Sequence, residues 1–233
     1  MFNGKLKALT FSYDDGVTQD QRLIETLNKY SLKCTFNLNS GLLGTSNSLV
    51  CSGVTVAHCK PRACEIKGIY EGHEIASHTL THPMLTELDE DEIIRQVEDD
   101  RIALSEIAGY DIVGFAYPGG GKNFDSRVSE IIRKGTGVRY CRTTVSSYSF
   151  EKQDNLFEFS PTVCHLREFD KMTALAKEFV EMKPDKPSVF YIWGHSYEFD
   201  ISNTWKKFEE FCEFISKRDD IFYGTNKEIL LSE

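Results

Sequence analysis

Long hydrophobic runs are missing from this 233-residue sequence. No apolar stretch reaches the roughly 18–20 residues that a helix needs to span a bilayer. Residues 1–10 carry two lysines but lack the apolar core of a signal peptide. We therefore expect a cytoplasmic chain that has no transmembrane segment and no membrane partner.

An excess of basic residues is missing as well. Lys and Arg together number 27 against 36 Asp and Glu, which gives a formal net charge of −9. Because an acidic surface repels phosphate backbones, nucleic acid is not an expected partner. Hydrophobic residues make up 40% of the chain, enough for one sizeable core. Residues 1–233 are therefore expected to form a single domain.

Closely spaced cysteine pairs are a third absence. Cys51, Cys59 and Cys64 cluster near His58, but structural zinc sites use pairs that are two to four residues apart. We expect reduced thiols there. The surrounding stretch 41–64 is rich in Gly, Ser, Thr and Asn, which indicates a long loop-like excursion. We expect this excursion to border the functional site.

Two nucleotide-binding signatures are also lacking. Neither a Gly-rich dinucleotide fingerprint nor a phosphate-binding loop with Lys follows any strand-like segment. Strand-like and helix-like segments do alternate along the whole chain, without a long linker or an internal repeat. Such alternation favours an α/β fold with a parallel sheet and helices outside. Without a nucleotide fingerprint, we prefer a β/α barrel to an open doubly wound sheet.

The strand-like segments are recognised by apolar content or by alternation of apolar and polar residues. They are 6–12, 34–38, 73–77, 113–117, 138–144, 162–165 and 188–193. Some helices carry end signals. Thr18 and Gln21 are expected to cap the first helix. Asp89 with Glu92 is expected to begin a long helix that Gly109 ends.

Polar, titratable or glycine-rich groups follow several of these strands. In a β/α barrel the reacting groups come from the carboxyl ends of the strands, so we expect these groups to share one face. Each group alone has a structural explanation as a turn, a cap or a packed side chain. Their joint placement is what indicates a site. They are Tyr13-Asp14-Asp15-Gly16, His78-Thr79-Leu80-Thr81-His82, Pro118-Gly119-Gly120-Gly121, Arg142 and Gly194-His195-Ser196.

One chemistry fits the joint set. His78, His82 and one of the two adjacent aspartates make a two-histidine, one-carboxylate group, which holds a divalent metal and leaves coordination sites open. Such an ion activates water and polarises a substrate carbonyl. The second aspartate is then free to act as a base, and His195 can act as an acid. The residues therefore predict metal-assisted hydrolysis of an amide or ester.

An ordered set of motifs runs through most of the chain: Asp14-Asp15-Gly16, the His78-x3-His82 pair, Phe115-Ala116-Tyr117-Pro118 and the late His195. This order resembles that of the NodB-like polysaccharide deacetylases, carbohydrate esterase family four. The resemblance extends from Leu9 to about Asp200. It implies a distorted (β/α)7 barrel and a hydrolase that removes acetyl groups, N-acetyl in the first place, from a carbohydrate.

The resemblance also implies residue roles. Asp14 would be the general base, and His195 the general acid that protonates the leaving amine. Asp15, His78 and His82 would hold one divalent ion, and water bound to it would be the nucleophile. The backbone N–H of Gly119 would stabilise the oxyanion. We expect Zn²⁺, with Co²⁺ or Ni²⁺ as alternatives, because such sites select weakly.

The sequence departs from the family pattern in its third motif. Ala116 stands where the family usually has an Arg that pairs with the catalytic base. Arg142, late in the next strand, is our candidate for supplying the same charge. The alternative is an Arg on the surface of that strand.

The fourth motif departs as well. What orients His195 is not recognisable; Glu198 is a candidate, although a solvated Glu is the favoured interpretation. Gly194 stands where a leucine often lines the acetyl pocket, so Trp193 or Ile192 is expected to shape that pocket instead.

The remaining histidines and nearby aromatic residues are weaker candidates. His73 is interpreted as structural. For His165 a structural role is favoured over contact with the site. Tyr13, Tyr148 and Tyr197 neighbour the site segments, where they would stack on sugar rings or form walls.

Three functions remain open. The leading one is a metal-dependent deacetylase acting on an N- or O-acetylated carbohydrate. The second keeps the machinery but acts on a small non-sugar amide, which the missing signal peptide favours because most polymeric acetylated glycans lie outside the cytoplasm. The third is a catalytically inactive carbohydrate-binding domain, suggested by Ala116. The third is the least expected, because binding alone would not need the full set of chemical groups.

Overall fold

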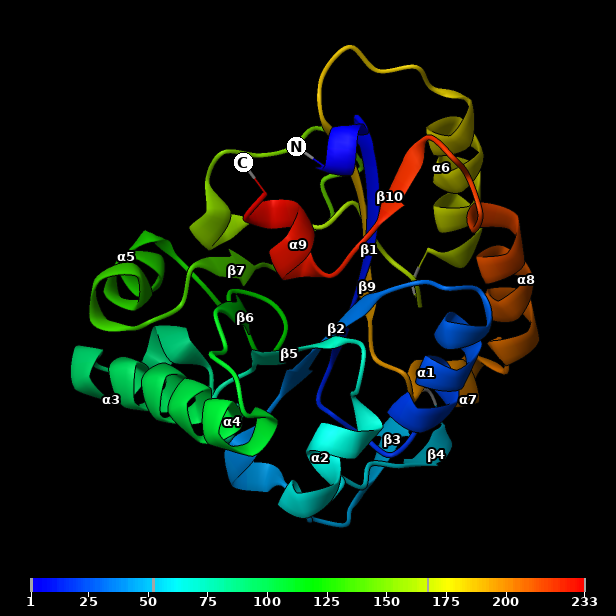
Figure 1. Cartoon of the computed structure of the whole chain (residues 1–233). Coiled ribbons are helices and arrows are strands. Elements are labelled where there is room, and N and C mark those ends of the chain that lie inside the picture. Colours follow the sequence, from blue (N-terminus) through cyan, green and yellow to red (C-terminus); the bar gives the residue numbers. More distant parts are fainter. Residues whose placement is uncertain (1, 52, 167, 233) are drawn as a thin grey trace.

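The computed structural model describes residues 2–51, 53–166 and 168–232. Its main sheet contains parallel strands only: β1 (Lys7–Asp14), β2 (Cys34–Leu38), β5 (Glu74–Ser77), β6 (Gly114–Ala116), β7 (Tyr140–Arg142), β8 (Val163–Cys164), β9 (Ser188–Gly194) and β10 (Ile221–Tyr223). Seven of them follow the order β7-β6-β5-β2-β1-β9-β8, and β10 pairs with the first residues of β1. The sheet curls into a half-barrel (Figure 1).

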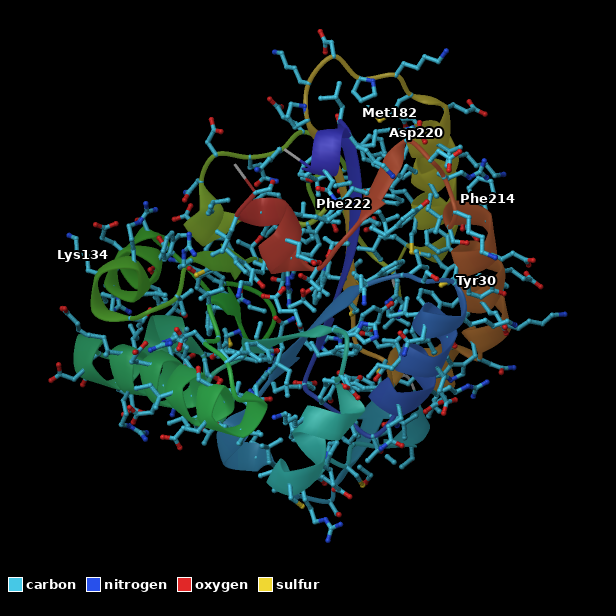
Figure 2. The ribbon with its side chains drawn as sticks, in the orientation of Figure 1. Tyr30, Lys134, Met182, Phe214, Asp220 and Phe222 are labelled. Carbon is cyan, nitrogen blue, oxygen red and sulfur yellow. The ribbon has the colours of Figure 1, made fainter. Side chains whose placement is uncertain are left out.

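Helices pack around this sheet, most of them on its outer side (Figure 1). They are α1 (Asp20–Lys29), α2 (Ala63–Ile69), α3 (Glu90–Ile94), α4 (Asp100–Ala108), α5 (Ser126–Gly135), α6 (Phe169–Glu181), α7 (Glu198–Ser202), α8 (Trp205–Ile215) and α9 (Asn226–Leu230). Lys134 on α5 and Phe214 on α8 project away from the sheet (Figure 2). The predicted α/β class and the distorted (β/α)7 barrel are confirmed.

Alternation along the strands separates an apolar outer layer from a more polar interior. On β1, the side chains of Leu9, Phe11 and Tyr13 belong to the large core cluster shared with α1, α6 and α8. Because successive side chains point to opposite faces of a strand, the side chains between them, including Ser12 and Asp14, face the interior. The last inward residue of β1 is therefore a carboxylate at the carboxyl end of the strand.

The helix ends test two capping predictions. Oδ1 of Asp89 accepts a hydrogen bond from the Glu92 N–H at 2.9 Å, and Gly109 ends α4 with a left-handed φ of 81°, so both ends of the long helix are confirmed. The predicted Thr18 cap of the first helix is wrong. α1 begins at Asp20 without a side-chain cap. The Thr18 hydroxyl donates instead to Oε1 of Gln19 at 3.3 Å, and the Thr18 N–H donates to the Cys59 carbonyl at 2.8 Å.

The excursion 41–64 is more regular than a loop. It contains an antiparallel hairpin of β3 (Ser48–Cys51) and β4 (Val54–Ala57), and α2 begins at its end. Figure 1 shows this hairpin beside α1 and α7, outside the main sheet. The segment therefore packs against the turn that follows β1, where the site lies.

Candidate active site

The carboxyl ends of the strands surround a cavity of about 1000 Å³. Six of the predicted site residues line it: Asp14, Asp15, His78, His82, Gly119 and His195. Arg142 is fully buried behind Asp14. The structure therefore brings together side chains that are up to 181 residues apart in the sequence, counted from Asp14 to His195 (195 − 14).

Asp15, His78 and His82 form one compact group, in which each offers a ligand atom within 4.8 Å of the others. Oδ1 of Asp15 lies 3.6 Å from Nε2 of His82 and 3.9 Å from Nε2 of His78. Nδ1 of His78 lies 2.8 Å from the backbone oxygen of Ala116. This contact assigns the proton to Nδ1 and leaves the Nε2 lone pair for the cavity.

The electrostatics of this group suit a metal. Burial lowers the pKa of His78 to about 4, so the ring is neutral, as a ligating imidazole must be. Burial also lowers the pKa of His82. Two neutral imidazoles and one carboxylate are a donor set that fits a divalent first-row ion.

Tight backbone turns bring the three ligands together. Asp15, Thr79 and His82 have φ angles of 77°, 70° and 61°, in the left-handed region that residues other than glycine rarely occupy. Asn39 holds one turn, because its Nδ2 donates to the backbone oxygens of His78 and Thr79 at 2.6 and 3.0 Å. Such conformations persist where the surrounding structure over-determines them, and they cluster at functional sites.

Arg142 contacts Asp14 across the interior of the half-barrel. Its Nη2 donates to both carboxylate oxygens, and both side chains are buried. Arg142 on β7 pairs in register with Ala116 on β6. The guanidinium thus enters from the strand beside the position where the family pattern has its Arg.

The environment of Asp14 favours its ionised form. Burial alone would raise the pKa of this carboxyl, but the neighbouring positive charges together, with Arg142 the largest among them, outweigh burial and the pKa is lowered. Nδ2 of Asn37 on β2 also donates to Oδ1 of Asp14 at 2.8 Å. Asn37 carries no motif signal in the sequence; only the register of β2 beside β1 brings it here.

Glu198 orients His195, and the interpretation of Glu198 as a solvated residue is wrong. Oε1 of Glu198 lies 2.9 Å from Nδ1 of His195, and Oε2 accepts the His195 N–H at 3.0 Å. Glu198 is buried, because α7 turns the chain back directly after β9. Burial alone would lower the pKa of His195, but the Glu198 charge and hydrogen bond raise it to about 9.

His165 lies outside the cavity lining but touches this pair. Its ring stacks on Phe199 with centroids 4.2 Å apart, and its Nε2 lies 3.4 Å from Oε2 of Glu198. A Cβ on Gly194 would lie 2.2 Å from Nδ1 of His165, so a leucine has no room at position 194. Trp193 lines the cavity, whereas Ile192 belongs to the outer core cluster.

The glycine loop after β6 forms one wall of the cavity. Gly119, Gly120 and Gly121 all line it. Gly119 has a φ of 78°, and a Cβ there would lie 2.6 Å from Sδ of Met84, so glycine is favoured at this position. The Asn123 side chain braces the loop by donating to the Gly119 carbonyl at 3.0 Å.

The hairpin excursion supplies residues that the motifs did not indicate, and its predicted position beside the site is confirmed. His58 and Lys60 line the cavity. Nε2 of His58 lies 3.1 Å from Oδ2 of Asp15, and Nζ of Lys60 donates to the Asp15 backbone oxygen. Burial alone would raise the pKa of Asp15, but the His58 hydrogen bond and neighbouring cations hold it well below its usual range.

The other residues singled out in the sequence have structural surroundings or form walls. Nδ1 of His73 accepts the Cys34 N–H at 3.2 Å, remote from the cavity lining, as a structural histidine would. Tyr13 is buried. Tyr148 and Tyr197 line the cavity, and the Tyr197 ring stacks on His195 with centroids 5.0 Å apart.

Comparison with known proteins identifies the family. The sequence profile described as polysaccharide deacetylase matches residues 3–140, more than half of the chain. The chain therefore belongs to the polysaccharide deacetylase family, and the resemblance to the NodB-like deacetylases of carbohydrate esterase family four is confirmed. The profile ends before Arg142 and His195.

Particular relatives share parts of the chain. Peptidoglycan-N-acetylmuramic acid deacetylase PdaC of Bacillus subtilis (strain 168) is 28% identical over 125 residues, which are 54% of this chain and 24% of PdaC. The chain thus spans about a quarter of the length of this curated relative.

Solved structures share the fold. One is the Xyl-CE4 domain of a multidomain xylanase from the hindgut metagenome of Trinervitermes trinervoides, with 18% identity, a TM-score of 0.60, and 97% of this chain and 90% of that one covered. Another is a family 4 acetyl xylan esterase from Clostridium thermocellum in complex with a cobalt ion, with 16% identity, a TM-score of 0.52, and 97% and 91% covered.

Among the residues that the structure describes, no helix combines the length and the apolar character needed to cross a bilayer. The cytoplasmic location expected from the sequence stays a prediction.

Proposed function

We propose that residues 1–233 form one NodB-like domain that removes acetyl groups from a carbohydrate by hydrolysis, with the help of a divalent metal ion. N-acetyl groups are the first choice of substrate. The observation that carries this proposal is the joint arrangement around one cavity: a two-histidine, one-carboxylate group, an ionised aspartate held by a buried arginine, and a histidine paired with a glutamate.

Asp15, His78 and His82 would hold the ion. Zn²⁺ is our first choice, with Co²⁺ or Ni²⁺ as alternatives. When bound, such an ion supplies a Lewis acid that polarises the acetyl carbonyl and lowers the pKa of water.

Asp14 acts as the general base and takes a proton from the attacking water. Its contact with Arg142 keeps it ionised for this task. The N–H of Gly119 stabilises the negative charge that develops on the acetyl oxygen. Fixed donors of this kind act without reorganising during the reaction.

His195 acts as the general acid. An amine is a poor leaving group until it is protonated, and His195 holds a proton at neutral pH because Glu198 raises its pKa to about 9. The cavity volume of about 1000 Å³ and the exposed Tyr148 on its wall suit a sugar better than a small amide.

The test is acetate release from acetylated oligosaccharides and small amides by metal-reconstituted protein. We expect release from N-acetylated sugars, loss of activity on chelation, and recovery with Zn²⁺ or Co²⁺. His78→Ala and His82→Ala should each lose metal affinity. Activity on small amides alone would replace the carbohydrate assignment, and unchanged metal affinity in both variants would refute the ligand assignment.

A further inference from the structure

The hairpin of β3 and β4, together with the residues that follow it, holds the metal-ligand aspartate from outside the barrel. His58 reaches the Asp15 side chain, and Lys60 reaches its backbone oxygen. Neither residue belongs to the ligand group or to the acid–base pair of the proposed reaction. Both contacts converge on a residue with a left-handed φ of 77°, a conformation that needs support from its surroundings.

The hairpin is itself well anchored. The His58 N–H donates across the hairpin to the Asn47 carbonyl at 2.8 Å, and the Thr18 N–H, just after the ligand turn, donates to the Cys59 carbonyl at 2.8 Å. The His58 side chain is only 16% exposed, and its ring packs edge-on against Tyr197 with centroids 5.3 Å apart. The imidazole therefore presents a fixed nitrogen to Asp15.

The two carboxylate oxygens of Asp15 have different partners. Oδ1 faces the histidine pair, at 3.6 Å from His82 and 3.9 Å from His78. Oδ2 lies 3.1 Å from Nε2 of His58. A carboxylate without such a partner can rotate about its terminal bond, so the His58 contact fixes the plane of the Asp15 carboxylate and thereby the direction of the oxygen that faces the ligands. Within the described chain, the grouped ligand atoms are those of Asp15, His78 and His82, without His58.

We propose that His58 is a positioning residue of the metal site, which holds Oδ2 of Asp15 so that Oδ1 stays directed at His78 and His82. The inference rests on the proposed metal-dependent function and deepens it, because it makes ion affinity depend on the hairpin. Partners of metal ligands typically change affinity about 10- to 100-fold when they are removed.

The test measures Zn²⁺ affinity without substrate, by competition of the metal-free protein with a chromophoric chelator. His58→Ala should bind Zn²⁺ about 10- to 100-fold more weakly. His58→Phe keeps a ring against Tyr197 but has no donor, so it should show the same loss even if the alanine variant folds poorly. His58→Gln retains a donor and should recover most of the affinity. Thr55→Ala, exposed on β4, is the matched control and should match the native protein.

The outcomes separate this inference from the function on which it rests. Native affinity in a folded His58→Phe protein, together with a loss in His78→Ala, overturns the role of His58 alone. Native affinity in His78→Ala overturns the metal site itself. The visible spectrum of the Co²⁺ protein should keep its band positions in His58→Phe; a shift like that of His78→Ala would make His58 a ligand and refute the positioning role.

Discussion

The two ends of the half-barrel interior each bury a carboxylate, in opposite electrostatic settings. At the carboxyl ends of the strands, Asp14 contacts the Arg142 guanidinium beside the cavity. At the amino ends, Glu74 accepts three hydrogen bonds. They come from Oγ1 of Thr35 at 2.8 Å, from the Tyr140 hydroxyl at 2.9 Å and from the backbone N–H of Lys227 at 2.8 Å. These three donors are neutral groups.

The pKa directions follow from this difference. Burial would raise the pKa of both carboxyls, and for Glu74 burial prevails, so its pKa is raised. For Asp14 the neighbouring positive charges together prevail, with Arg142 the largest among them, so its pKa is lowered. Glu74 does not line the cavity. Burial of a carboxylate therefore does not by itself mark a site; at Asp14 a paired cation and access to a cavity accompany it.

The two ends are also joined by hydrogen bonds. Asn226, the first residue of α9, donates from Nδ2 to Oγ of Ser12 at 3.2 Å. Nδ2 of Asn37 lies between Ser12, at 2.9 Å, and Asp14, at 2.8 Å. The short C-terminal helix therefore closes the amino end with a polar side chain whose contacts lead to the site.

The largest expected effect comes from the acid–base pair. Asp14→Asn and His195→Ala should each lower kcat by about 10²–10⁴-fold while metal stays bound, because each removes one proton transfer. Steady-state kinetics with parallel metal analysis measures this. The native profile of kcat against pH should be bell-shaped, and its high-pH limb should vanish in His195→Ala. A His195→Ala enzyme that keeps most of its activity would rule out the mechanism.

Removing the cation should make Asp14 behave like Glu74. Arg142→Ala leaves a buried carboxylate unpaired, which should lower the free energy of unfolding by about 3–5 kcal/mol. The pKa of Asp14 should rise, so the low-pH limb of kcat should move up by about 1–3 pH units. Arg142→Lys should recover part of both effects. Denaturant unfolding and pH profiles measure them, and an unmoved low-pH limb in Arg142→Ala would contradict the pairing.

Glu198→Gln should lower the pKa of the general acid His195 without removing its imidazole. The Glu198 charge is the largest of the contributions that raise the pKa of His195 to about 9 against the effect of burial, ahead of the Glu198 hydrogen bond and the charges of Asp15 and Asp14. Without that charge the pKa falls, so His195 loses its proton at a lower pH and the high-pH limb of kcat should move down. The low-pH limb, which belongs to Asp14, should stay in place. A profile with both limbs unmoved would show that Glu198 does not tune His195.

Glu74→Gln should have the smallest effect and should affect stability alone. Because folding raises the pKa of Glu74, the stability it contributes is complete below its unfolded pKa of about 4.3 and is lost as pH rises through the higher folded value. The neutral Gln removes this loss, so the free energy of unfolding should depend less on pH over that window. Denaturant titrations at several pH values measure this, with kcat expected to be unchanged.

Local chemistry explains which parts of the fold could be predicted from sequence. The strand 34–38 was predicted with the bounds of β2, because apolar and polar residues alternate through it. Gly109 could be predicted as the end of α4, because glycine readily adopts the left-handed φ found there. In contrast, β10 was not predicted, since a three-residue strand is set by its pairing with β1. The helix α9 was not predicted either, although Thr225 and Glu228 form a capping box at its start.

The site divides in the same way. Residues with metal-ligand or acid–base chemistry at strand ends could be identified from their types and order. His58 and Asn37 could not, because the aspartates that they contact lie 43 and 23 positions away in the sequence. Glu198 was misjudged because burial depends on how α7 turns back after β9, which the sequence near it does not reveal.

Asp15 and His82 lie in left-handed turns. The rate and the entropic cost of ion binding depend on whether these turns are already ordered when the ion arrives. Contacts within the protein hold both turns, from Lys60 to the Asp15 backbone oxygen and from the His82 N–H to Oγ1 of Thr79 at 3.0 Å, so we expect the ordering of both turns to precede the arrival of the ion. Association then needs no loop closure and loses little chain entropy, which is the advantage of preorganisation. Backbone amides in the two turns should accordingly exchange their hydrogens at similar rates with and without the ion.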